Sequence, residues 1–404
     1  MSRAQVAIVG SGPSGCYAAQ AISRRRPSAE VTVIDRLPMP FGLIRYGVAA
    51  DHQGAKAITA QFDRLFSAAS VRFAGGIHVG HDVSTEQLLE AFDAVVWAGG
   101  LTEDRRLDIE GEDLPGVYHA GEVTRAWNGH PLQDWGHIRI QGRVVVIGAG
   151  NVSLDLVRLM AKRSEDLVGT DLDDVFHHTL PNGVGDIEVV SRRGPDETRW
   201  DTAMIREICA LPNVDIVLGP LDRELVQGAA QGGNSSASLL LARTEEPGRG
   251  GSTAVRFTFD AEPLCISGDE RVQGLTVGRT GRKEALLADT VICAVGFAGA
   301  SPARDDPRFF LTGWANTGAR GTIPSLRTIA KDLASEVDAI LPAASDKRGP
   351  EAILRLADKS VDFSEWKHLD AHELASAPPG RCRRKVRELS QVDHLLLRLR
   401  KAAR

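Results

Sequence analysis

Residues 5–15 read QVAIVGSGPSG, a short apolar strand that runs directly into a glycine-rich turn. Residues 143–153 read RVVVIGAGNVS and repeat this pattern about 140 residues further along the chain. Glycine lets such a turn approach a pyrophosphate closely, and the following helix start offers free N–H groups and a positive dipole end. One such turn is a weak signal. Two turns in one chain predict two bound dinucleotides, an arrangement that suits hydride transfer between them.

The pattern predicts an α/β fold with two Rossmann-like three-layer dinucleotide-binding domains. The second turn falls between two apolar strands expected at residues 93–100 and 289–297, so we expect the second domain to be inserted into the first. The predicted boundaries are 1–102 and 294–404 for one domain and 103–293 for the other, with a helical, basic tail from about residue 346. Two segments low in apolar residues are expected to be hairpin tips, namely 228–238 and 246–253.

Composition is that of an ordinary globular protein, with 43% hydrophobic and 25% charged residues over 404 positions. That length favours two domains. No apolar run reaches membrane-spanning length, and a strand begins too early to leave room for a signal peptide, so we expect a cytoplasmic protein. A net charge of −5 and the lack of a basic motif interleaved with aromatic residues argue against nucleic-acid binding.

None of the five cysteines stands in a C-x-x-C pair. We therefore expect no active-site disulfide, no iron–sulfur cluster held by this chain and no metal site.

Basic residues gather in the last 24 positions, where nine of them face only two acidic ones. Two interpretations remain open. The cluster is either a solvated helix face with favourable C-terminal capping, or a docking patch for an acidic partner.

Two charged positions distinguish the cofactors. Asp35 follows the strand at 30–34 and lies 25 residues after Gly10, a spacing that suits hydrogen bonds to an adenosine ribose. An acidic residue here is compatible with FAD or NAD and repels a 2′-phosphate, and the first turn is interpreted as the FAD site. Arg192 and Arg193 follow a strand of the second unit and can bind a 2′-phosphate, so the second turn is interpreted as an NADP(H) site. Asn151 either contacts the pyrophosphate or caps its helix.

Several segments together resemble the adrenodoxin-reductase type of ferredoxin–NADP⁺ reductase. The resemblance covers about residues 4–335, with the order and spacing of the segments kept. The segments are residues 40–52 (PFGLIRYGVAADH), Gly148 to Asp155, Arg192 to Pro195, and Gly313-Trp314 through Gly321-Thr322-Ile323. One departure is Met204, which stands where the family carries a glutamate, with Glu207 one turn further on.

The resemblance implies a set of site residues. It assigns FAD contacts to Gly10, Gly12, Pro13, Ser14, Gly15, Asp35, Gly42, Leu43 and Val79, and closure over the flavin ring to Trp314, Gly321, Thr322 and Ile323. It assigns NADP(H) contacts to Gly148, Gly150, Asn151, Val152, Arg192 and Arg193. His52 and Asp155 match a pair near the flavin edge, and a structural role for His52 stays equally open.

The expected function is NADPH-dependent reduction of ferredoxin or another acidic iron–sulfur protein. NADPH would give a hydride to FAD, and the flavin would pass single electrons to the partner. One alternative is a flavin-dependent oxidase or monooxygenase that acts on a small molecule. Another is a non-catalytic flavin-binding protein.

Overall fold

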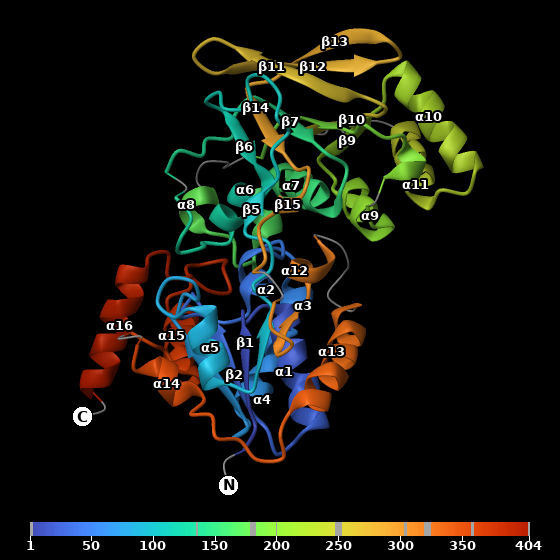
Figure 1. Cartoon of the computed structure of the whole chain (residues 1–404). Coiled ribbons are helices and arrows are strands. Elements are labelled where there is room, and N and C mark those ends of the chain that lie inside the picture. Colours follow the sequence, from blue (N-terminus) through green and yellow to red (C-terminus); the bar gives the residue numbers. More distant parts are fainter. Residues whose placement is uncertain are drawn as a thin grey trace.

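The structure is a computed structural model that describes residues 3–134, 136–177, 183–198, 200–246, 253–302, 305–318, 325–356 and 359–402. Two bodies, each built around a parallel sheet, lie one above the other, and both chain ends belong to the lower body (Figure 1). Over the described part of the chain, no helix combines the length and apolar character needed to cross a bilayer.

The lower body contains a five-stranded parallel sheet. Its strand order is β16-β4-β1-β2-β3, with β1 at Gln5–Val9, β2 at Glu30–Asp35, β3 at Val71–Gly75, β4 at Ala94–Trp97 and β16 at Phe309–Leu311. Every residue of β1 is buried, because the sheet is covered on both faces.

Alternate side chains of β1 belong to two different packing layers. Val6 and Ile8 pack with helices α1 (Pro13–Arg25), α4 (Thr59–Phe66), α13 (Leu326–Ile340) and α15 (Phe363–Ala375). Ala7 and Val9 pack with α5 (Thr85–Ala91) and α14 (Pro350–Leu354) on the opposite face. This gives three layers around one sheet.

The upper body contains a six-stranded parallel sheet. Its strand order is β6-β14-β7-β8-β10-β9, with β6 at Val117–His119, β7 at Arg143–Ile147, β8 at Asp186–Val190, β9 at Val214–Val217, β10 at Thr253–Thr258 and β14 at Thr290–Cys293.

Helices cover one face of the upper sheet, and a second sheet covers the other. The helices are α6 (Ala120–Trp127), α7 (Asn151–Ala161), α9 (Thr202–Ala210), α10 (Pro220–Gln231) and α11 (Ser235–Glu245). The covering sheet is antiparallel and consists of β11 (Glu262–Gly268), β12 (Val272–Arg279) and β13 (Arg282–Leu287). The predicted α/β class with two Rossmann-like three-layer units is confirmed.

The prediction of a hairpin tip at residues 228–238 is wrong, because α10 and α11 occupy this segment and only Gly232–Asn234 separate them. The side chain of Asn234 caps α11 by accepting a hydrogen bond from Ala237 N–H at 3.0 Å. The other predicted tip, at 246–253, lies mostly outside the described residues.

Short elements occupy the junction and the end of the chain. β5 (Glu103–Asp104) and β15 (Phe297–Ala298) form an antiparallel pair where the chain passes between the bodies. The others are α2 (Gly42–Tyr46), α3 (Gln53–Lys56), α12 (Trp314–Thr317), α8 (Asp174–His177), the 3₁₀ turns at Ser164–Leu167 and Pro195–Glu197, and the C-terminal α16 (Leu389–Ala402).

Candidate functional site

The first glycine-rich turn follows β1 at the carboxyl edge of the lower sheet. Gly10 has φ of +105°, and a Cβ there would lie 2.5 Å from the carbonyl oxygen of Ala98. A Cβ at Gly15 would lie 1.8 Å from the carbonyl oxygen of Gly10, so both positions need glycine. Within the described parts of the chain, a Cβ at Gly12, the N-cap of α1, would meet nothing within 4 Å, so space is left beside the first N–H groups of this helix.

Asp35 ends β2 beside this turn. Its Oδ2 accepts hydrogen bonds from the N–H and the hydroxyl of Ser11 at 2.7 and 2.6 Å, and its Oδ1 accepts one from Leu37 N–H at 2.9 Å. The carboxylate therefore holds the turn in shape. Oδ1 keeps a second lone pair, and contact with a ribose stays a prediction.

The other predicted FAD contacts surround the same edge. A Cβ at Gly42 would lie 2.9 Å from the Cα of Gly12, so the start of α2 packs directly on the turn. Leu43 is 38% exposed, whereas Val79 is buried in the core beneath the edge.

Trp314 follows the last strand of the lower sheet. Its ring stacks on that of Phe297, with centroids 5.5 Å apart and planes at 27°. A Cβ at the preceding Gly313 would lie 2.1 Å from Ser14 Oγ, so this segment abuts the first turn, whose helix begins at Pro13. The remaining predicted ring contacts, Gly321, Thr322 and Ile323, lie outside the described residues.

The second glycine-rich turn repeats this construction after β7. Gly148 has φ of +121°, and a Cβ there would lie 2.4 Å from the carbonyl oxygen of Ala294. A Cβ at Gly150, the N-cap of α7, would meet no atom of the described residues within 4 Å. Asn151 Oδ1 accepts a hydrogen bond from Asp201 N–H at 2.8 Å and so fixes the start of α9, while Val152 packs partly buried against the core.

Arg192 and Arg193 lie just beyond β8, the strand next to β7. Gly148 N–H donates to the carbonyl oxygen of Val190 at 2.8 Å, which places this strand end beside the second turn. Arg192 is exposed, and within the described parts of the chain its side chain makes no ion pair. A pair of guanidinium groups at this point suits a phosphate next to the pyrophosphate turn.

His52 and Asp155 meet across the two bodies. Their Nδ1 and Oδ1 atoms are 3.8 Å apart, and His52 Nε2 lies 3.0 Å from Glu207 Oε2. Beneath them, the buried Arg158 donates to Asp155 at 2.7 Å and lies 3.3 Å from Glu207. The structure therefore adds Glu207 and Arg158 to the predicted pair.

Asp51 anchors this group from the lower body. It accepts two hydrogen bonds from Arg158 at 2.8 Å and one from Lys162 at 2.7 Å. Burial opposes ionisation of Asp51, but both cations outweigh it and hold its pKa well below the usual range. Burial raises the pKa of Asp155 against the opposing charge of Arg158.

A second buried ionic group joins the bodies through the C-terminal tail. Asp171 accepts hydrogen bonds from Lys56 at 2.7 and 2.8 Å and pairs with Lys385 at 2.7 Å. Burial would raise the pKa of Asp171, but Lys385 and Lys56 together lower it to about 2. Burial also lowers the pKa of Lys385 to about 7.

The interpretation as a solvated helix face does not fit the first half of the basic tail, because residues 381–387 are not helical, and docking of an acidic partner stays a prediction. The side chains there bind carboxylates of the same chain, in the pairs Arg381–Asp174, Arg383–Asp370, Arg384–Asp174 and Arg387–Asp173. These ion pairs hold the tail against α8 and α15, and Arg384 stays 53% exposed.

Comparison with known proteins identifies the family. The family described as pyridine nucleotide-disulphide oxidoreductase matches residues 4–186. Cindoxin reductase of Citrobacter braakii is 36% identical over 96% of this chain and 90% of its own length. NADPH-ferredoxin reductase FprA of Mycobacterium tuberculosis is 32% identical over 96% of this chain and 98% of its own length. A solved structure of M. tuberculosis FprA in complex with NADPH superimposes with a TM-score of 0.91 at 30% identity, covering 98% of this chain and all of that one.

The chain therefore belongs to the adrenodoxin-reductase type of ferredoxin–NADP⁺ reductases, which are FAD- and NADP-dependent oxidoreductases. The residues present fit both coenzymes. Two open helix N-termini suit two pyrophosphates, and the exposed Arg192 suits a 2′-phosphate.

Proposed function

We propose that this protein is a cytoplasmic NADPH-dependent ferredoxin reductase. In this proposal residues 1–102 and 294–404 bind FAD, and residues 103–293 bind NADP(H). The electron partner is a ferredoxin or another acidic iron–sulfur protein. Bound FAD would supply the capacity to accept a hydride from NADPH and to release electrons one at a time.

The proposal depends on two similar glycine-rich turns, one at the edge of each parallel sheet. His52, Asp155 and Glu207 form contacts between the two bodies that contain these sheets. Ligands of open α/β sheets bind beyond the carboxyl ends of the strands. The open helix starts at Gly12 and Gly150 are the corresponding binding points.

The chain's own residues then have positioning roles. Arg192 and Arg193 would bind the 2′-phosphate of NADPH. The salt-bridged group around Arg158 would fix the two bodies so that nicotinamide and flavin meet at one distance, the main requirement for hydride transfer. The stacked pair Phe297 and Trp314 would limit access of water from the side of α12.

The test is a comparison of electron acceptors with the purified holoenzyme, run with NADPH and NADH side by side. We expect rapid bleaching of the flavin by NADPH in stopped flow and catalytic reduction of a ferredoxin. Slow or absent bleaching would favour the non-catalytic alternative. Fast bleaching with high oxygen consumption and no ferredoxin reduction would favour the oxidase or monooxygenase.

A further inference from the structure

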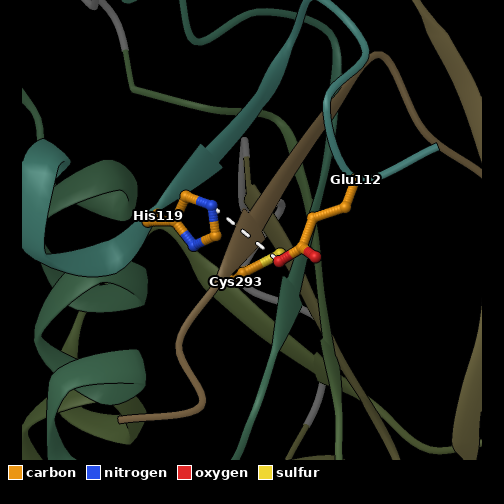
Figure 2. A group of neighbouring side chains, drawn as sticks. All are labelled: Glu112, His119 and Cys293. Carbon is orange, nitrogen blue, oxygen red and sulfur yellow. Dashed lines mark ion pairs between the residues drawn. The ribbon is translucent and has the colours of Figure 1, made fainter. Parts of the chain in front are cut away.

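Three side chains that can bind a metal converge at the carboxyl ends of two strands of the upper sheet (Figure 2). His119 ends β6 and Cys293 ends β14, and the two residues are register partners in adjacent parallel strands. Their side chains therefore stand side by side on one face of the sheet. Glu112 reaches them from the loop between β5 and β6, and one ligand atom from each of the three lies within 4.8 Å of the others.

The carboxylate of Glu112 is held in place before any ion binds. Its side chain is 1% exposed, Oε1 accepts a hydrogen bond from Leu107 N–H at 2.8 Å, and Oε2 accepts one from Asp108 N–H at 2.9 Å. Arg106 lies 3.6 Å from Oε2, on the outer side, and shares its charge with Asp113. Oε1 lies 3.8 Å from His119 Nε2 and keeps a lone pair for a cation.

The nitrogen and sulfur ligands are poorly satisfied as they stand. Among the described residues, buried His119 Nδ1 finds no hydrogen-bond partner. Cys293 is buried, and burial together with the nearby Glu112 carboxylate raises the pKa of its thiol to about 12.

We propose that Glu112, His119 and Cys293 form a Zn²⁺ site with three protein ligands and one open position. A thiolate, an imidazole and a carboxylate are the ligands that zinc takes in proteins, whereas Ca²⁺ and Mg²⁺ require oxygen ligands. Tetrahedral zinc needs ligand atoms roughly 3.3–3.8 Å apart. Small side-chain rotations of His119 and Cys293 would bring the three ligand atoms, now within 4.8 Å of one another, to these distances.

Binding must release a proton. The neutral Cys293 thiol loses its proton to solvent as the sulfur–zinc bond forms, so the balance is one Zn²⁺ taken up and one proton released. Cys293 directly precedes Ala294, whose carbonyl oxygen lies against Gly148. An ion here would therefore fasten the loop before β6 and the end of β14 beneath the second glycine-rich turn.

The test uses the FAD-loaded protein after treatment with a chelator and desalting. Co²⁺ serves as the probe, because its ligand-field bands lie in the red, beyond the absorption of oxidised flavin. We expect one Co²⁺ per chain with a band intensity typical of tetrahedral thiolate coordination, displacement by Zn²⁺, and release of one proton. Occupancy should also raise the melting temperature.

The variants Cys293→Ser and His119→Gln should each bind Co²⁺ at least about tenfold more weakly. Cys265→Ser on β11 is the matched control and should bind as the unchanged chain does. His119 is 19% exposed, so its variant provides a result even if Cys293→Ser does not fold. Less than stoichiometric binding by the unchanged chain, or equal affinity in His119→Gln and Cys265→Ser, would overturn the proposal.

Discussion

Replacing Arg192 and Arg193 with glutamine should abolish most of the preference for NADPH over NADH, measured as the ratio of their kcat/KM values. Removing two charge-assisted hydrogen bonds to a phosphate costs about 3–6 kcal/mol. Arg192 is exposed, which places the loss at the lower end, about 3 kcal/mol or roughly a hundredfold in kcat/KM. NADH has no 2′-phosphate, so its kcat/KM should change by less than about threefold.

The assay is steady-state reduction of ferricyanide, which needs no knowledge of the natural partner. Arg256→Gln is the matched control, since Arg256 belongs to the same sheet and pairs with Asp186, at the opposite end of β8 from the arginine pair. Flavin content should be unchanged in all variants. If kcat/KM fell equally for NADPH and NADH, or fell as far in the control, the assignment of the arginine pair to the 2′-phosphate would be refuted.

Three further outcomes are expected. Gly10→Ala should abolish stable folding with bound flavin, because the new Cβ would clash with the backbone. Gly12→Ala should leave the melting temperature of the FAD-free protein unchanged and lower only the flavin-to-protein ratio. Glu207→Gln should slow flavin bleaching by NADPH about twofold to fivefold, because a half-exposed ion pair contributes up to about 1 kcal/mol. The FAD content should not change. An unaltered bleaching rate would show that the contact between Glu207 and His52 has only a structural role. Asp171→Asn should lower the unfolding free energy by about 3–5 kcal/mol at pH 7, because it leaves two lysines buried without a counter-ion. In the unchanged chain the folded pKa of Asp171, about 2, lies below its ordinary 3.8. The stabilisation from this carboxylate, about 2 kcal/mol, is therefore present above pH 4 and disappears as the pH falls toward 2. Denaturant titrations at several pH values should show that the variant loses less stability over this acidic range.

Local features of the fold could be predicted because their causes are local. The apolar run of β1, the glycines of its turn and Pro13 at the helix start all lie within twenty residues, and the observed strand and helix match the expected ones. The region of α10 and α11 has glycine, serine and asparagine where a loop is expected. Burial of Val226 and Leu240 against the upper sheet stabilises helix there, which is a tertiary effect that composition does not reveal.

The candidate site divides in the same way. The turns and the arginine pair follow strands and could be found from sequence, whereas the contact of Glu207 with His52 joins residues 155 positions apart through the packing of two bodies. The tail is the clearest case. Its net charge could be counted, but its partners, such as Asp370 for Arg383 and Asp173 for Arg387, depend on how the chain returns to the lower body.

The order of strands in the lower sheet has a consequence for synthesis. β16 completes the edge next to β4 but is translated some two hundred residues after it, and α13 covers α1 but is translated about three hundred residues after it. A nascent chain therefore carries an uncovered apolar face while the ribosome makes the whole upper body. Chain release before residue 340 would leave that face exposed, so prematurely terminated products should depend on chaperones or proteases for their removal.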